Sequence, residues 1–391
     1  MQIPISKPFF GEEERAAIQE PLASGWVVQG PKVAEFERLF AAYSGAANAV
    51  ATSSCTTALH LSLVALGIGP GDEVIVPSFT WVATANAVEM TGARPVFVDI
   101  DLETFNVDPS RVESAVGSRT KAVIPVSLFG VSAPMQEILD IASRRGLKVV
   151  EDAACAVGAW YRGRHAGTLA DIGCFSFHPR KAITTGEGGM VVSADGGIAE
   201  LVRSLRDHGA SKSDLARHLG KRSYVLPDFD RVGYNYRMTD LQGALGVAQI
   251  ARLEAILELR TERAQAYDRS LRELAWLRPQ ALPDGYRHGY QSYVCLFRPE
   301  EPSMANVDEL HRRRNELMDS LEAAGIATRP GTHAVHALGF YRRKYGLEPG
   351  DLPNAFLADQ LSVALPLYAQ MTEEEQRYVL EHLTTAQAEV A

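Results

Sequence analysis

Hydrophobic residues in the first 240 positions alternate between two spacings. Short runs rich in valine and isoleucine, with the length of buried strands, are separated by stretches in which apolar residues recur every three or four positions. The strand-like runs cover residues 72–78, 94–101, 121–130 and 148–154. The helical stretches cover residues 58–68, 80–90, 107–116 and 135–146, after a helical N-terminal region (12–42) that is interrupted at 24–26 and at 30–31. This alternation predicts a largely parallel sheet covered by helices on both faces.

The pattern changes near residue 238, where a long helix-like run begins. The expected elements of this second part are a helical run at 239–274, a strand at 291–297, a helix at 308–326, an irregular segment at 328–341 and a terminal helix at 372–386. We therefore expect two domains: a large α/β domain over residues 1–245 and a small α+β C-terminal domain over residues 246–391.

The composition narrows the class of protein. A formal net charge of −9 over 391 residues leaves no broad basic face for a nucleic-acid backbone. The four cysteines are widely spaced and form no CxxC pair, which argues against a metal site or a disulfide framework and favours a reducing compartment. The N-terminus lacks a signal-peptide pattern, and no apolar run approaches the ~20 residues that span a bilayer. We expect a cytoplasmic protein that binds neither nucleic acid nor membrane.

Lys181 lies in an unusual setting for a lysine, between an apolar, β-prone run and the glycine-containing residues 182–193. In a partly desolvated pocket the pKa of a lysine falls, and its free amine can form a Schiff base with an aldehyde. Most lysines are solvated surface charges, so Lys181 is a candidate for Schiff-base chemistry only in combination with other residues.

Other features fit pyridoxal phosphate, which needs a lysine, a carboxylate for its ring nitrogen, donors for its phosphate and a flat or apolar cover for its ring. Motifs for nucleotide phosphate loops, dinucleotides, zinc proteases and serine hydrolases are absent. Asp152 ends a strand-like run and can serve the ring nitrogen, although an aspartate there also suits a simple turn. Trp81 can cover the ring or belong to the core.

Small polar residues precede the helical stretch at 58–68. Ser54, Cys55 and Thr56 lie where free backbone N–H groups at the start of a helix favour an anion, and the same residues suit an ordinary helix cap. Ser176, before Lys181, adds a hydroxyl group. These residues form the expected phosphate site.

The features occur together in five motifs: residues 52–88 (TSSCTTALHL and onward), 95–101 (PVFVDID), 149–159 (VVEDAACAVGA), 175–192 (FSFHPRKAITTGEGGMVV) and 233–245 (GYNYRMTDLQGAL). In this order they resemble the DegT/DnrJ/StrS family of sugar aminotransferases. The resemblance runs from residues 24–31 to residues 365–372, nearly the whole chain. It implies the pyridoxal-phosphate-dependent transferase fold of the aspartate aminotransferase superfamily.

The resemblance also implies roles for single residues. Lys181 matches the cofactor-bound lysine, Asp152 the partner of the ring nitrogen and Trp81 the ring cover. The implied phosphate contacts are Ser54, Cys55, Thr56 and Ser176, together with Asn235 from a neighbouring subunit. A homodimer with shared active sites follows. Cys155 stands beside the ring where the family commonly has histidine or glutamine, and Cys55 stands where it commonly has glycine.

The substrate class is the inference that the sequence supports least. The implied substrate contacts are Trp26, His178, Arg180, Arg329 and His336, with Arg237 as a further candidate. Guanidinium groups suit both the carboxylate of an amino donor and a nucleotide diphosphate. The implied reaction moves an amino group from an amino acid, by family habit L-glutamate, to a nucleotide-linked keto sugar.

Three alternatives remain open at the level of sequence. The acceptor can be a keto-cyclitol, or the chain can be a cofactor-binding regulatory protein without turnover. A dehydratase on the same scaffold is disfavoured, because such relatives carry histidine where Lys181 stands.

Overall fold

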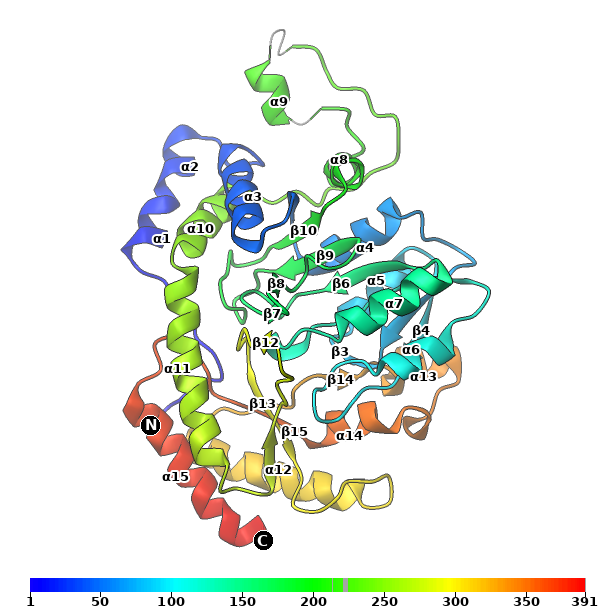
Figure 1. The fold of residues 1–391 in the computed structure, drawn as a ribbon. Coiled ribbons are helices and arrows are strands. Elements are labelled where there is room, and N and C mark those ends of the chain that lie inside the picture. Colours follow the sequence, from blue (N-terminus) through cyan, green and yellow to red (C-terminus); the bar gives the residue numbers. More distant parts are fainter. Residues whose placement is uncertain (213, 221–223, 391) are drawn as a thin grey trace.

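A seven-stranded sheet forms the centre of the molecule (Figure 1). The computed structural model describes residues 1–212, 214–220 and 224–390. The strand order is β1-β10-β9-β6-β5-β2-β4; β10 runs antiparallel to both its neighbours, and every other neighbouring pair is parallel. The strands are β1 (Asn48–Thr52), β2 (Glu73–Pro77), β4 (Arg94–Val98), β5 (Thr120–Val123), β6 (Lys148–Asp152), β9 (Ile172–Ser176) and β10 (Gly189–Ser193). The prediction of a mostly parallel sheet is confirmed.

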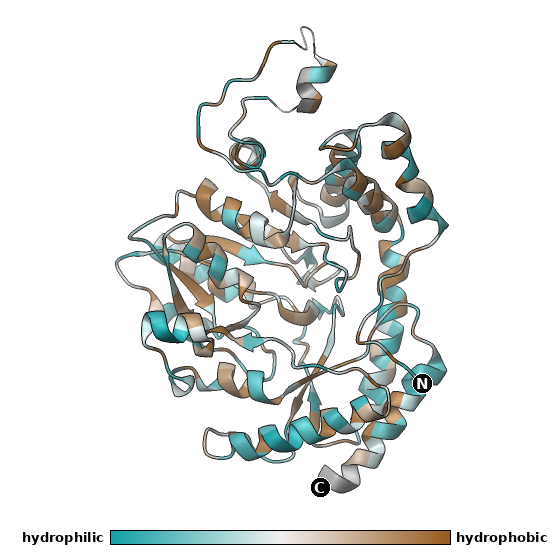
Figure 2. Ribbon diagram, turned by 180° about the vertical axis from the view of Figure 1, so that it is seen from behind, coloured by the Kyte–Doolittle hydropathy of each residue, from teal (hydrophilic) through white to brown (hydrophobic). Residues whose placement is uncertain are grey.

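Helices cover both faces of this sheet because its strands are apolar on both sides, as the hydrophobic strands in Figure 2 show. Val74 and Val76 of β2 pack with α4, α5 and α8, whereas Ile75 between them packs with α6 and α7. These helices are α4 (Cys55–Ala65), α5 (Ala83–Met90), α6 (Pro109–Ala115), α7 (Met135–Arg145) and α8 (Gly196–Leu205). The alternation places the ends of the parallel strands between two helical layers.

The N-terminal helices and the long central helices cover the β1 end of the sheet. They are α1 (Glu12–Ala17), α2 (Gln19–Ser24), α3 (Pro31–Ser44), α10 (Asp240–Ala251) and α11 (Leu253–Leu271). Asp240 caps α3 from a distant part of the chain, because its carboxylate accepts the N–H groups of Gly30 and Val33, both at 2.9 Å. This contact fixes α3 against α10.

A second core surrounds a small antiparallel sheet of order β11-β13-β15. Its elements are β11 (Leu277–Pro279), β13 (Tyr293–Phe297), β15 (Ser362–Leu365), α12 (Val307–Ala323), α14 (Pro353–Leu361) and α15 (Glu373–Val390). Ile3 belongs to the same core and forms a β-bridge with Ile326, so the N-terminal segment packs with C-terminal elements. The division of the chain after residue 245 stays a prediction; that point lies inside α10.

The remaining elements are short and lie outside the two main sheets. They are β3 (Phe79–Thr80), β7 (Trp160–Tyr161), β8 (Arg164–His165), β12 (Tyr286–Arg287), β14 (His333–Ala334), α9 (Asp214–Leu219), α13 (Gly339–Tyr345) and the 3₁₀ turns η1 (Leu128–Gly130), η2 (Val335–Ala337) and η3 (Pro349–Asp351). The pair β14 and β3 brings His333 opposite Thr80. A C-terminal segment thereby pairs with the residues that follow β2 of the large sheet.

Three expected elements differ from those observed. The strand expected over 121–130 ends at Val123, and Pro125 follows, which cannot donate a ladder hydrogen bond. The helical run expected over 239–274 is broken at Arg252, whose side chain binds Glu14 and lies over the ring of Phe9, 4.4 Å from its centroid. The segment expected to be irregular, 328–341, contains β14, η2 and the start of α13.

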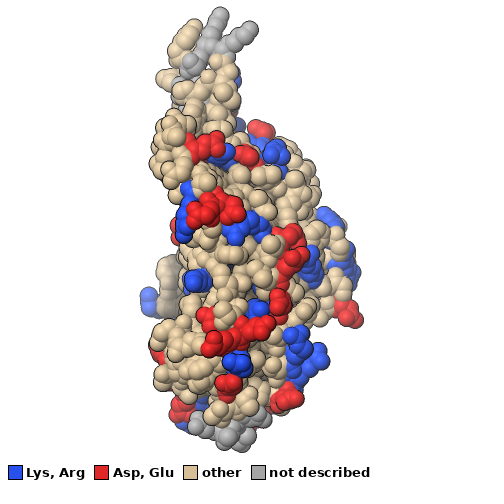
Figure 3. All heavy atoms as spheres, turned by 90° about the vertical axis from the view of Figure 1, so that its left-hand side faces the viewer, with Lys and Arg blue, Asp and Glu red and all other residues tan. Residues whose placement is uncertain are grey.

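The surface carries mixed charge. Acidic and basic side chains are interspersed on the face drawn in Figure 3. In the part of the chain that the structure describes, no helix has both the length and the apolar character needed to cross a membrane.

Candidate active site

A cavity of about 520 Å³ lies at the carboxyl ends of the parallel strands, where α/β sheets bind ligands. Most of the residues expected from the sequence line it: Ser54, Cys55, Thr56, Trp81, Asp152, Cys155, Ser176, His178, Arg180, Lys181 and Arg329. Lys181 is the one lysine among the described residues of this lining. A larger hollow of about 710 Å³ lies between α3 and α8, but ion pairs such as Arg206 with Glu37 occupy its charged groups. We therefore place the candidate site in the smaller cavity.

Asp152 ends β6 and turns its carboxylate into this cavity. The hydroxyl of Thr84 donates to one carboxylate oxygen (2.8 Å) and the N–H of Ala154 donates to the other (3.1 Å). Burial raises the pKa of Asp152, while these two donors and the nearby Lys181 act in the opposite direction. The carboxylate is therefore held in one orientation.

The start of α4 lies on one wall of the cavity, where the free N–H groups of a helix favour an anion. Ser54 is the N-cap, and its hydroxyl accepts the N–H of Thr57 at 3.2 Å, so the N–H groups of Cys55 and Thr56 lie in the first turn of the helix. Burial raises the pKa of the Cys55 thiol well above its usual range, which keeps the thiol neutral. A β-carbon on Gly189 would lie 2.4 Å from the carbonyl group of Ser54, so only glycine allows β10 this close to the helix start.

Lys181 is held in a tight loop between the antiparallel strands β9 and β10. The N–H of Lys181 donates to the carbonyl of His178 (2.8 Å), and the N–H of Thr185 donates to the carbonyl of Phe177 (3.0 Å). The amine of Lys181 donates to the sulfur of Cys155 at 3.1 Å. Burial and the neighbouring cations Arg180, Lys181 and Arg329 lower the pKa of His178 against the opposing effect of Glu187, so this imidazole is neutral at pH 7.

Two guanidinium groups, those of Arg180 and Arg329, face the cavity from different segments. Among the described residues neither has an ion-pair partner, and the Nε atom of Arg329 is buried without a hydrogen-bond acceptor. Burial, followed by the charge of Arg180, lowers the pKa of Arg329. Two guanidinium groups without an ion-pair partner favour an anionic ligand beside them.

The chain matches the model of the DegT/DnrJ/EryC1/StrS aminotransferase family over residues 8–384. The chain belongs to this family. It is 40% identical over 380 residues to the spore coat polysaccharide biosynthesis protein SpsC of Bacillus subtilis, covering 97% of this chain and 95% of that one.

Two solved structures support the same family membership. The aminotransferase TlmJ of Streptoalloteichus hindustanus superposes with a TM-score of 0.89 at 32% identity, covering all of both chains. The PLP-form of the putative sugar aminotransferase Spr1654 of Streptococcus pneumoniae superposes with a TM-score of 0.90 at 29% identity, again covering all of both chains. The protein is thus a transaminase of the DegT/DnrJ/EryC1/StrS family that uses pyridoxal 5'-phosphate, and its family supports a sugar as the substrate.

The lining residues fit the cofactor of this family. The cavity offers one primary amine (Lys181), one oriented carboxylate (Asp152) and a helix start that is open to an anion, and Gly189 leaves room for that helix start. Trp81 is 55% exposed and lies at the rim, with its ring 5.8 Å from that of His333. Each requirement of pyridoxal phosphate therefore has a candidate residue in the cavity.

Four expected residues lie outside the lining: Trp26, Asn235, Arg237 and His336. Trp26 donates to the carbonyl of Gln29 at 3.3 Å, Asn235 is exposed and bridges to Asp207, and Arg237 pairs with Asp207. In a single chain these side chains do not reach the cavity.

The expectation for His336 needs correction. His336 is fully buried, and both ring nitrogens are engaged, with the hydroxyl of Ser78 (2.6 Å) and the carbonyl of Pro349 (3.2 Å). A side chain without accessible surface cannot contact a substrate. His336 instead fixes the segment that carries His333 beside Ser78.

Sequence reasoning missed Thr84, Gln291 and His333. Thr84 lies three positions after Trp81 in the first turn of α5, where a hydroxyl on an otherwise apolar buried face was the available signal. Gln291 donates from its side-chain amide to the carbonyl of Arg180 at 2.9 Å. Its place at the start of an apolar strand gave no sign of this contact.

Proposed function

We propose that the enzyme transfers an amino group from L-glutamate to a nucleotide-linked keto sugar, with Lys181 as the lysine that binds pyridoxal phosphate. The single observation that carries this proposal is the joint presence of the Lys181 amine, the Asp152 carboxylate and two unpaired guanidinium groups in one cavity. The relatives described above, which include sugar aminotransferases, support a sugar acceptor.

The residues of the cavity have different proposed roles. Bound pyridoxal phosphate supplies the electron sink for negative charge at the carbon that bears the amino group. Asp152 would keep a proton on the ring nitrogen, and the first turn of α4 with Ser176 would hold the phosphate. Lys181 would hold the cofactor through its amine and, when free and neutral, would accept the proton of the carbon that bears the amino group.

The arginine pair binds the anionic parts of both substrates. Arg329 and Arg180 offer planar donors that suit the donor carboxylate in one half-reaction and the diphosphate of the sugar nucleotide in the other. His178 is neutral at pH 7 and adds no further charge beside them. The proposed role of Trp81 is to cover the ring at the rim.

We also propose a homodimer with shared active sites in the cytoplasm. The segment that carries α9 extends away from the rest of the chain (Figure 1) and exposes several large apolar side chains: Leu219, Tyr224, Leu226, Phe229 and Val232. A second copy would bury these side chains and bring Asn235 and Trp26 to the neighbouring cavity. The four free cysteines suit a reducing compartment.

Product analysis tests the substrate. The enzyme with cofactor is incubated with L-glutamate and a panel of nucleotide-linked 3-keto sugars, nucleotide-linked 4-keto sugars and keto-cyclitols, and aminated products are identified by mass. We expect one nucleotide-linked keto sugar to be aminated. Amination of a cyclitol alone would replace the sugar assignment, and cofactor binding without amination of any acceptor would favour a regulatory protein.

Borohydride treatment tests the lysine. The reagent fixes the cofactor covalently to the lysine that holds it, and peptide mapping then identifies that lysine. We expect the label on the peptide that contains Lys181. A label on another lysine would contradict the proposed site.

A further inference from the structure

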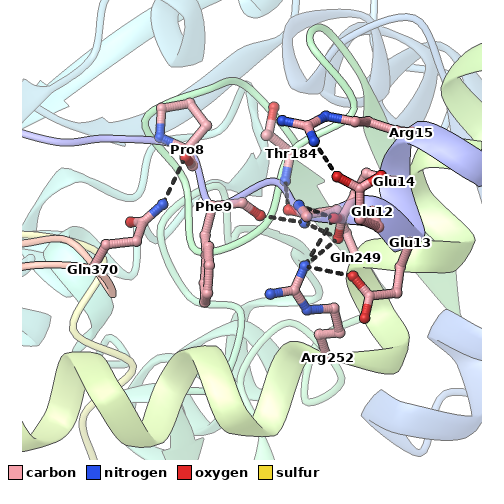
Figure 4. Close-up of polar contacts among 11 residues, drawn as sticks. Pro8, Phe9, Glu12, Glu13, Glu14, Arg15, Thr184, Gln249, Arg252 and Gln370 are labelled. Atoms are coloured by element: carbon pink, nitrogen blue, oxygen red, sulfur yellow. Dashed lines mark hydrogen bonds and ion pairs between the residues drawn. The ribbon is translucent and has the colours of Figure 1, made fainter.

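The loop that carries Lys181 is anchored from outside the cavity by a buried glutamine of α10. The backbone N–H of Thr184, three positions after Lys181, donates to Oε1 of Gln249 at 3.2 Å (Figure 4). Thr184 is buried, and its hydroxyl donates to the carbonyl of Phe177 at 2.8 Å, which closes the loop on itself. The bond from Gln249 therefore sets where the closed loop sits relative to α10.

The side-chain amide of Gln249 has only one orientation that satisfies its partners. Its Nε2 donates to the carbonyl of Phe9 (2.9 Å) and to the carboxylate of Glu14 (2.7 Å). Both partners can only accept, so the nitrogen must face them and the oxygen must face Thr184. Gln249 is 1% exposed, and water cannot replace a lost partner.

Glu14 is itself held in place. Its carboxylate accepts the N–H of Gly11 (2.6 Å) and pairs with Arg252 (2.8 Å), the residue at which α10 and α11 separate. Burial opposes ionisation, but the hydrogen bonds from Gly11 and Gln249 and the charge of Arg252 outweigh it and lower the pKa of Glu14. An ionised carboxylate at this point keeps the amide of Gln249 from flipping.

We infer that Gln249 is a positioning residue for Lys181, and that Glu14 sets its orientation. This inference rests on the proposed role of Lys181 as the cofactor-binding lysine. Neither Gln249 nor Glu14 lines the cavity, so they act through the backbone of the lysine loop. The hydrogen bonds between Glu14 and Gln249 and between Gln249 and Thr184 link helix α1 to the loop that carries Lys181.

Exchanging the amide and the carboxylate tests the inference. Gln249→Glu places two carboxylates against each other and removes the donor to Phe9, whereas Gln249→Glu combined with Glu14→Gln restores one donor and one acceptor between the two positions. In the enzyme with cofactor, we expect Gln249→Glu to shift the pH midpoint of the visible absorbance of the lysine-bound cofactor. We also expect it to lower kcat about tenfold with the KM for glutamate within about twofold, the size of one buried hydrogen bond. The double variant should recover part of both changes but not all of them, because it restores the bond between positions 14 and 249 while the donor to the carbonyl of Phe9 stays absent.

A second buried glutamine provides a matched control. Gln376 of α15 is 3% exposed and donates to the carbonyl of Arg263 at 2.6 Å, in the C-terminal core. Gln376→Leu should lower the melting temperature like Gln249→Leu but leave the absorbance midpoint unchanged. If the Gln249 variants lose stability without a shift of the midpoint, or if the double variant recovers neither the midpoint nor kcat, the positioning role is wrong.

Borohydride labelling separates this failure from failure of the proposed function. If the wild type carries the label on a lysine other than Lys181, the proposed site is wrong. If Lys181 is labelled in the wild type and the midpoint is the same in all Gln249 variants, the result supports Lys181 as the cofactor-binding lysine, and the inference about Gln249 is wrong.

Discussion

At the scale of single residues, two hydrogen-bond donors hold the Asp152 carboxylate of the candidate site: the hydroxyl of Thr84 and the N–H of Ala154. Burial raises the pKa of this group, and the hydrogen bond from the hydroxyl of Thr84 lowers it more than the N–H of Ala154 or the charge of Lys181 does. The hydroxyl of Thr84 also contacts that of Thr80 at 3.0 Å, which fixes its position. A neutral hydroxyl thus helps to decide whether Asp152 is ionised.

Replacing Thr84 with valine should therefore raise the lower pH limit of activity. The variant loses a hydrogen bond to a charged group, so the pKa of Asp152 rises further, and the ionised form that holds the ring proton is lost at a higher pH than in the wild type. We expect the acidic limb of the profile of kcat/KM to move up by about one pH unit, the equivalent of about 1.4 kcal/mol.

Thr84→Ser is the matched control for this change, because it keeps the hydroxyl. Its acidic limb should coincide with that of the wild type. An unshifted limb in Thr84→Val would mean that Thr84 has no influence on the ionisation of Asp152.

At the scale of elements, local pattern was sufficient for strands β2, β4 and β6 and for helices α4 to α7. Runs such as that of β2 are apolar on consecutive positions, so their burial on both faces follows from the sequence. The break at Arg252 was not predictable, because the residues around it all favour a helix and the partner that stabilises the break, Glu14, is distant in sequence. Contacts between distant segments were missed in the same way.

In the candidate site, too, local motifs were predictable and contacts between distant segments were not. Lys181, Asp152 and the start of α4 belong to local motifs, and the structure brings them into one cavity. His336 was misassigned because its burial depends on Ser78 and Pro349, neither of which is near it in sequence. A residue type therefore indicates chemistry, but only tertiary contacts decide whether the side chain is accessible.

Gly189 offers a test of the contact between β10 and α4. In Gly189→Ala the new β-carbon would lie 2.4 Å from the Ser54 carbonyl group, so the start of α4 and β10 must move apart. We expect cofactor affinity to fall roughly tenfold, within the range of about 1–3 kcal/mol for overpacking. Titration of the cofactor-free protein with pyridoxal phosphate measures this change.

Gly196→Ala serves as the comparison for Gly189→Ala. Gly196 starts α8, and a β-carbon there meets no atom within 4 Å. This variant should keep the wild-type cofactor affinity, because the added methyl group has open space. Equal affinity in Gly189→Ala and in the wild type would show that the helix start tolerates the shift.

At the scale of the whole molecule, a single chain leaves the proposed site incomplete. Asn235 is exposed and outside the cavity, although the resemblance assigns it to the cofactor phosphate. The segment before it exposes Leu226 (76%) and Val232 (87%), which is costly for a protein that stays alone in water. Both observations are explained together if a second copy covers this segment and receives Asn235.

Mixed dimers test this arrangement. Lys181→Ala and Asn235→Ala should each be inactive alone, because each removes one part of every site. If Lys181 and Asn235 of one site come from different chains, a mixed dimer holds one site with both defects and one with neither. Random exchange of subunits at equal amounts makes about half of the dimers mixed, so activity should return to about a quarter of the wild-type value. If both residues of a site come from the same chain, every site keeps one defect, and mixing restores no activity however completely the subunits exchange.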